Sequence, residues 1–101
     1  MKKENNQNEQ WMLLVLLLKE IADQKNISIN QIAATSGIEQ SSVSRFFSLK
    51  FKPTLLTFLE IAKAIKVNFF FEDQDGKSDL NQAMERAMEA LGRRIKKLNK
   101  N

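Results

Sequence analysis

The stretch that decides the fold is Ser28–Thr54, which reads SINQIAATSGIEQSSVSRFFSLKFKPT. It contains two short helical patterns separated by a single glycine. In the first pattern, Ile29–Ser36, apolar and small residues recur every three or four positions, so they share one helix face. Ser28 and Gln31 have the spacing of a capping box, and Gly37 can take the left-handed conformation that ends a helix. These signals predict a short helix over Ile29–Ser36.

The second pattern, Gln40–Ser48, has an apolar face and an opposite polar face. Burial of Val43, Phe46 and Phe47 would leave a face of hydroxyl and guanidinium groups without a carboxylate. Such a helix suits insertion into a groove of DNA, where base edges offer hydrogen-bond partners. We therefore interpret the two patterns as a helix-turn-helix. The polar residues are Ser41, Arg45 and Ser48, with Ser44 on the flank and Gln40 at the start.

The composition of the 101 residues argues against several classes of protein. The length supports one domain with at most a terminal extension. There is no cysteine and no histidine, so a disulfide framework is excluded and the commonest metal ligands and general base are missing. We therefore expect that the protein is not an enzyme. We also expect no catalytic residue, no bound metal and no cofactor. The lack of cysteine fits a reducing cytoplasm, which is the expected location.

The small positive charge is concentrated around the two central patterns. The chain has a net charge of +4. Residues 27–68 carry five basic and two acidic side chains, a net charge of +3. Phosphate binding requires an excess of this kind in the DNA-contacting segment.

The N-terminal region is expected to be a disordered polar arm, residues 1–8, followed by a helix over Glu9–Gln24. Its apolar run, Trp11–Leu18, is far shorter than the ~20 residues that span a bilayer. It is also followed by charged residues rather than a cleavage site, so no membrane contact is expected. The surplus apolar residues indicate packing on a second side of the helix. The predicted core stripe is Leu14, Leu17, Leu18 and Ile21, which leaves Met12, Leu13, Val15 and Leu16 as the surplus.

After the second pattern, Pro53 marks a boundary and Thr54 is a cap for a helix over Leu55–Ile65. The aromatic run Phe69–Phe71 is either a short helix or an extended segment, and three bulky rings in succession favour the extended form. Residues 72–79 are predicted to be an acidic turn and linker. The stripe of the Leu55–Ile65 helix is predicted to be Leu55, Phe58, Leu59, Ala62 and Ile65.

A C-terminal helix is predicted over residues 80–98. Its apolar residues form a seam close to that of a coiled coil, although Gly92 weakens the helix by ~1 kcal/mol relative to alanine. The helix therefore needs a partner, either the surplus face of the first helix, the same helix of a second copy, or both. We expect it to be a dimerisation element. The seam residues are Leu80, Met84, Ala87, Leu91 and Leu98.

The span Leu18–Phe69 resembles the Cro/repressor-type (XRE-like) helix-turn-helix family. The matching residues are Ile27-Ser28, Ile32-Ala33, Gly37-Ile38, Val43-Ser44-Arg45, the Lys50 to Thr54 loop, and Leu59 with Ile61 to Ile65 and Val67. The resemblance implies an all-α fold, namely a five-helix lambda-repressor-like domain that binds operators, usually as a dimer. To this the chain adds its C-terminal helix. The sequence departs from the family pattern at Ile29, Glu39, Phe47, Leu49 and Lys66, the last two standing where the family has glycine.

In phage repressors of this family, Gln and a small polar residue at the start of the third helix read bases, and Gln40-Ser41 occupies those positions. Each assignment below competes with the simpler interpretation of a solvated or helix-capping residue. The expected base contacts are Gln40, Ser41, Ser44 and Arg45. The expected phosphate contacts are Ser28, Asn30, Gln31, Ser48, Lys50, Lys52 and Thr54.

The predicted function is sequence-specific binding of double-stranded DNA by a homodimer, as a transcriptional repressor or autoregulator. The alternative is an antitoxin or adaptor whose main partner is another protein, a toxin or a regulator, because large exposed apolar surfaces mark interaction sites. The basic run Arg93–Lys97 is interpreted as the complement of the negative end of its own helix, with a DNA-contacting tail as the alternative.

Overall fold

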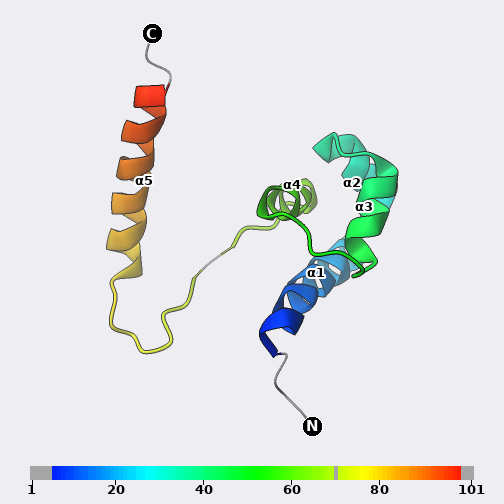
Figure 1. Ribbon diagram of the computed structural model, residues 1–101, viewed down its shortest axis with the longest axis horizontal. Helices are drawn as coiled ribbons and strands as arrows, with labels where there is room; N and C mark the ends of the chain where they lie inside the picture. The colour runs from blue at the N-terminus through cyan, green and yellow to red at the C-terminus, as the bar shows by residue number, and fades with distance from the viewer. Residues whose placement is uncertain (1–5, 70, 99–101) are drawn as a thin grey trace. The chain divides into compact units, whose positions relative to one another are not determined.

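The computed structural model describes residues 6–69 and 71–98. Within these ranges the secondary structure consists of five α-helices and no strand (Figure 1), so the predicted all-α fold is confirmed. The chain divides into two compact units, Met1–Asn68 and Phe69–Asn101. Each unit is described by itself.

The first unit contains four helices: α1 (Asn6–Gln24), α2 (Ile29–Ser36), α3 (Gln40–Phe47) and α4 (Leu55–Ile65). The family resemblance implies five helices in this domain. Of the predicted alternatives for the aromatic run, the short helix is not formed at Phe69 or Phe71, and Phe70 lies outside the described residues. Aromatic side chains lose χ1 freedom against the preceding turn of a helix and are favoured in extended segments, which disfavours a helix here.

Local capping signals set the ends of the short helices. The Ser28 hydroxyl accepts from the Gln31 N–H at 3.1 Å, and the Gln31 side chain accepts from the Ser28 N–H at 2.8 Å. Gly37 ends α2 with φ of 80°, and Thr54 accepts from the Thr57 N–H at 3.1 Å at the start of α4. The predicted bounds of α2 and α4 are therefore confirmed.

The first helix begins earlier than the sequence pattern predicts. Asn6–Asn8, assigned to the disordered arm, are helical, and residues 1–5 of that arm lie outside the described residues. Glu9 in the first turn is favourable beside the positive end of the helix, and this helps the polar residues before it to continue the α conformation.

The core of the first unit takes side chains from all four helices. Phe46 of α3 is buried in this core, with its ring centroid 4.9 Å from that of Phe47 and 6.1 Å from that of Phe58. Such edge-on and tilted ring pairs add to the stabilisation from apolar burial. The buried residues are Val15, Leu18, Ala22, Ile32, Val43, Phe46, Ile61, Ala62, Ala64 and Ile65.

Two of the predicted core stripes are partly wrong. On α1, Leu14 and Leu17 are 41% and 52% exposed, whereas Val15 is fully buried. The face in use is Trp11, Val15, Leu18 and Ala22, because in a continuous apolar run every helical stripe is apolar and the pattern cannot select one. On α4, Leu55 and Leu59 are 72% and 43% exposed, although Ala62 and Ile65 are buried as predicted.

The second unit contains a turn followed by α5 (Leu80–Leu98), which has the predicted bounds. The Asp73 carboxylate accepts hydrogen bonds from the Ser78 hydroxyl, from the Ser78 N–H at 2.8 Å and from the Asp75 N–H at 3.3 Å. The Asp79 carboxylate accepts from the Gln82 N–H at 3.0 Å, which satisfies one free donor at the start of α5. The side chains of residues 80–97 are exposed, and the side chain of Leu98 lies outside the description.

Candidate nucleic-acid interface

Helices α2 and α3 lie side by side and form the predicted helix-turn-helix (Figure 1). Val43 and Phe46 anchor α3 because both are buried in the core. The Ser36 hydroxyl accepts from the Ile38 N–H at 3.1 Å, and this bond holds the turn between the two helices. The backbone of α3 is therefore fixed by packing on one side and by the turn at its start.

The opposite side of α3 is open to solvent. The four side chains expected to contact bases all lie on this exposed part of the helix. Glu39 precedes α3, and its carboxylate makes no capping hydrogen bond. The structure thus places polar groups where a nucleic acid can approach α3 without moving any core residue. The four residues are Gln40, Ser41, Ser44 and Arg45, and Ser42 beside them is half-buried.

At the start of α2, the residues expected to contact phosphate also cap the helix. Ser28 and Gln31 use one side-chain oxygen each in the capping box, but their hydroxyl and amide donors face no partner in the described residues. Asn30 is exposed next to them. Capping and phosphate binding are therefore compatible at this end, since a helix N-terminus attracts anions.

Ser48 and Thr54 are committed to local hydrogen bonds. The Ser48 hydroxyl donates to the Arg45 carbonyl at 2.6 Å and accepts from the Lys50 N–H at 3.3 Å. The Thr54 hydroxyl donates to the Thr57 hydroxyl at 3.0 Å while it caps α4. A phosphate contact by either hydroxyl requires its proton to leave a protein acceptor, so their role as phosphate ligands stays a prediction.

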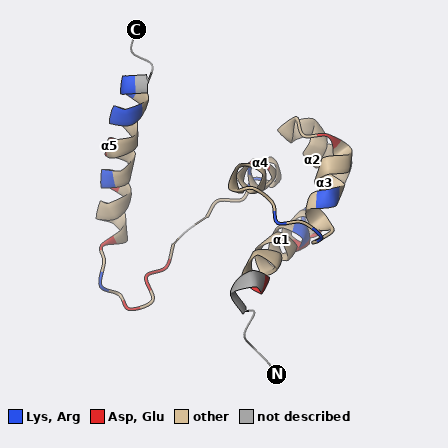
Figure 2. Ribbon diagram, in the orientation of Figure 1, with Lys and Arg blue, Asp and Glu red and all other residues tan. Residues whose placement is uncertain are grey.

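The loop after α3 brings a second group of predicted residues to the same face. Arg45 and Lys52 line one small groove of about 120 Å³, together with Ser42 and the exposed ring of Phe51. Basic residues therefore occur both on α3 and on the loop that follows it (Figure 2). Phe51, which lies between Lys50 and Lys52 in the sequence, is not among the residues expected to contact DNA.

A family comparison agrees with this geometry. The helix-turn-helix family model HTH_3 matches residues 18–71, which is more than half of the chain. The chain belongs to this helix-turn-helix family. No curated protein and no solved structure matched the chain. The Cro/repressor-type (XRE-like) resemblance is confirmed, and with it the assignment to DNA-binding transcription regulators, a family that is not enzymatic.

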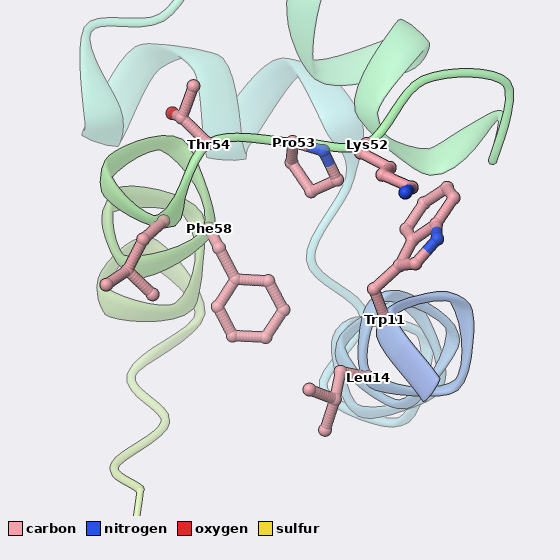
Figure 3. A pocket seen from close by; sticks show the side chains of 7 residues that line it. Trp11, Leu14, Lys52, Pro53, Thr54 and Phe58 are labelled. Carbon is pink, nitrogen blue, oxygen red and sulfur yellow. The ribbon is translucent and has the colours of Figure 1, made fainter. Parts of the chain in front are cut away.

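The helix-turn-helix domain has a second surface feature, an apolar groove of about 340 Å³ between α1 and the start of α4. In Figure 3, Trp11 and Leu14 of α1 lie across the groove from Phe58 of α4, with the Lys52–Thr54 segment along its edge. Leu55, predicted to be in the core, also lines it. The groove therefore contains residues from both mispredicted stripes.

No helix among the described residues is long and apolar enough to cross a lipid bilayer. No group of three or more His, Cys, Asp or Glu side chains within the described ranges is placed to hold a metal ion.

Proposed function

We propose that this helix-turn-helix protein binds specific sequences of double-stranded DNA as a homodimer and represses transcription, including that of its own gene. The observation that carries the proposal is the two-sided construction of α3. Its buried residues Val43 and Phe46 fix the helix, and its exposed side chains can form hydrogen bonds without a carboxylate among them. Helix-turn-helix proteins place this helix in the major groove.

Base discrimination would come from the start and middle of α3. The Gln40 amide can pair with both hydrogen-bonding groups of an adenine edge, and the Arg45 guanidinium can do the same with guanine or bind a phosphate. Ser41 and Ser44 can donate to or accept from either kind of base.

The surrounding groups would position the domain on the backbone. Lys50 and Lys52 supply charge beside the end of α3, and Asn30 and Gln31 stand at the positive end of α2. Contacts of this type fix register and orientation but carry little sequence information. Their number sets how strongly binding falls with added salt.

Two copies are proposed because one recognition helix reads only a few base pairs. In a dimer the two α3 helices would reach successive major grooves, roughly 34 Å apart, on a near-palindromic site. The exposed apolar residues of α1, α4 and α5 offer the surface for such pairing.

Selection of bound DNA from a random pool, followed by fluorescence polarisation over a salt series, tests the proposal. We expect an enriched near-palindromic sequence that binds about 10³-fold or more tightly than random DNA at the same salt. Equal affinity for selected and random DNA would contradict sequence-specific binding.

Arg45→Ala is expected to weaken binding to the selected site by ~1–3 kcal/mol and to relax the preference at one base position. Polarisation with a panel of single-base variants of the site measures both effects. Lys19→Ala is the matched control: it also removes one positive charge, but Lys19 is ion-paired with Asp23 on α1 at 3.0 Å. An unchanged base preference in Arg45→Ala would mean that Arg45 is not one of the residues that contact bases.

A second candidate function is an antitoxin or adaptor whose main partner is a protein. The groove between α1 and α4 favours it, as do Leu13 and Leu17, which are 64% and 52% exposed on α1. The mass of the purified chain by light scattering separates the two functions. A stable dimer supports the repressor, and a monomer that associates with a co-purified toxin or regulator supports the alternative.

A further inference from the structure

Helix α5 has one continuous apolar side. Leu80, Met84, Met88, Leu91 and Ile95 follow one another at steps of three or four residues, so they lie along one side of the helix. Each is between 40% and 65% exposed. The described part of the second unit contains no other helix that could cover this stripe.

The helix is weak without a partner. Gly92 stands in its interior, where it costs about 1 kcal/mol relative to alanine. Among the described residues nothing lies within 4 Å of the position that a Cβ would occupy there, so no close packing in the described part of the second unit requires this glycine. In proteins most of the stability of a helix comes from packing of its apolar face, so α5 gains stability from a partner that covers its stripe.

The charges of α5 are segregated along its length. Residues 79–89 carry three carboxylates and one arginine, a net charge of −2. Residues 90–98 carry four basic side chains and no carboxylate, a net charge of +4. Figure 2 shows the basic residues gathered toward the C-terminal end of the helix.

We infer that α5 pairs with the α5 of a second copy in the antiparallel direction. In this direction the acidic half of each helix faces the basic half of the other, whereas a parallel pair would place both +4 segments together. Opposed helix dipoles add to the preference. The stripe is compatible with the same two-fold symmetry, because Met84 and Ile95 lie equally far from its centre, as do Met88 and Leu91.

The antiparallel direction also fits the spacing that DNA requires, an argument that rests on the proposed function. A helix of 19 residues is about 28 Å long. The two N-terminal ends of an antiparallel pair, from which the two linkers leave, are then separated by about that length. This is close to the roughly 34 Å between recognition helices on successive major grooves. In a parallel pair both linkers leave from the same end.

Cysteine cross-linking of the full chain tests the inference, because the natural sequence contains no cysteine. The variants Met84→Cys and Ile95→Cys are made with tags of different size, mixed, and oxidised mildly. We expect the mixed 84–95 dimer to exceed the 84–84 and 95–95 dimers by about fivefold. Gln82→Cys, on the polar side of the same helix, is the control for random collision.

Two outcomes of the cross-linking would overturn the inference. Preferred 84–84 and 95–95 products would indicate a parallel pair. Yields no higher than that of the Gln82→Cys control would mean that α5 does not pair with a second copy, whether the stripe is covered by another protein or by the rest of its own chain.

Charge variants give a second test, because the dimer dissociation constant should rise for an antiparallel pair and fall for a parallel pair. Glu85→Gln combined with Glu89→Gln removes attraction from an antiparallel pair but removes repulsion from a parallel one. We expect the dimer dissociation constant to rise about three- to fivefold at low salt and less at high salt, since exposed charge pairs are screened. A lower dissociation constant would overturn the antiparallel direction.

The same preparations distinguish this inference from the proposed function. Preference for the selected DNA sequence is measured on the unmodified chain. If that preference holds while the cross-links contradict antiparallel pairing, the pairing inference fails and DNA reading stands. If the 84–95 cross-links form but no DNA sequence is preferred, antiparallel pairing stands and sequence-specific DNA binding fails.

Discussion

Three residues other than glycine take a positive φ in the described part of the chain: Asn26 at 60°, Leu49 at 66° and Lys66 at 68°. The family resemblance predicts glycine at the positions of Leu49 and Lys66, and glycine takes a positive φ without the steric cost of a Cβ. Leu49 also packs against the core, which offsets part of its strain. Lys66 is exposed, and its strain is offset by hydrogen bonds: its N–H donates to the carbonyls of Ala62 and Lys63, and its carbonyl accepts from the Lys25 Nζ.

Lys66→Gly is expected to raise the free energy of unfolding by about 0.5–1 kcal/mol. It relieves a left-handed strain of ~1–2 kcal/mol but adds freedom to the unfolded chain. Urea unfolding followed by circular dichroism measures the change. Lys63→Gly, within α4, is the matched control, and its free energy of unfolding should fall by about 1 kcal/mol. A loss of stability in both variants would contradict the strain at Lys66.

At the start of the second unit, the Ser78 hydroxyl lowers the pKa of Asp73 from 3.8 to about 2, helped by the Asp75 side chain and by the N–H groups of Ser78 and Asp75. A lowered pKa means that the ionised carboxylate stabilises the turn. That stabilisation is fully present above about pH 3.8 and is lost as the pH falls through about 2.

Ser78→Ala is expected to raise the pKa of Asp73 toward 3.8, because it removes the largest of the causes. Carboxyl carbon chemical shifts over a pH series measure the titration. Ser44→Ala, a serine on α3, serves as the control and should leave it unchanged. The same low pKa in Ser78→Ala would mean that the Asp75 side chain and the backbone N–H groups stabilise the ionised carboxylate without the Ser78 hydroxyl.

Between elements, one lysine joins the ends of two helices. The Lys25 Nζ, just after α1, donates to the Ile65 carbonyl at 2.9 Å and to the Lys66 carbonyl at 3.3 Å. These carbonyls belong to the end of α4, which has unsatisfied acceptors and a partial negative charge. Lys25 and Ile65 are 40 positions apart in sequence, so no local pattern predicts the contact.

Lys25→Met is expected to lower the free energy of unfolding by about 1 kcal/mol, because it keeps the apolar stem but removes the charged donor. Lys19→Met provides the comparison: it breaks the exposed ion pair with Asp23, and such pairs contribute little. We expect a change of less than about 0.5 kcal/mol there. Thermal unfolding of both variants measures the difference, and equal losses would contradict the capping role of Lys25.

At the scale of the whole molecule, packing decides which apolar residues form the core of the first unit. Leu17 and Leu18 are adjacent and chemically identical, yet they are 52% and 2% exposed. Leu18→Ala is expected to cost about 2–5 kcal/mol of unfolding free energy, because it leaves a cavity. Leu17→Ala should cost less than about 1 kcal/mol in the monomer. Denaturant unfolding at low protein concentration compares them, and equal costs would contradict the observed stripe.

The local signals of the central stretch predict the observed bounds of α2 and α4 and the observed start of α3, although α3 ends at Phe47 and not at the predicted Ser48. Ser28, Gln31, Gly37 and Thr54 act through hydrogen bonds or backbone freedom within a few residues, so their effects are visible in sequence. The exposed set on α3 could also be predicted, because Val43, Phe46 and Phe47 are its apolar positions; Val43 and Phe46 are buried, and Phe47 is half-buried. Whether those exposed groups touch DNA stays a prediction.

The sequence by itself determined the helical class, the capped bounds of the short helices and the polar face of α3, because each depends on residues three or four positions apart. Only the tertiary structure decided the buried side of α1, the exposure of Leu55 and Leu59, the contact of Lys25 with α4 and the groove beside Trp11. The physical reason is that burial depends on what packs against a helix. In an eight-residue apolar run every face of the helix is apolar, and the residues that pack against one face and bury it lie elsewhere in the chain.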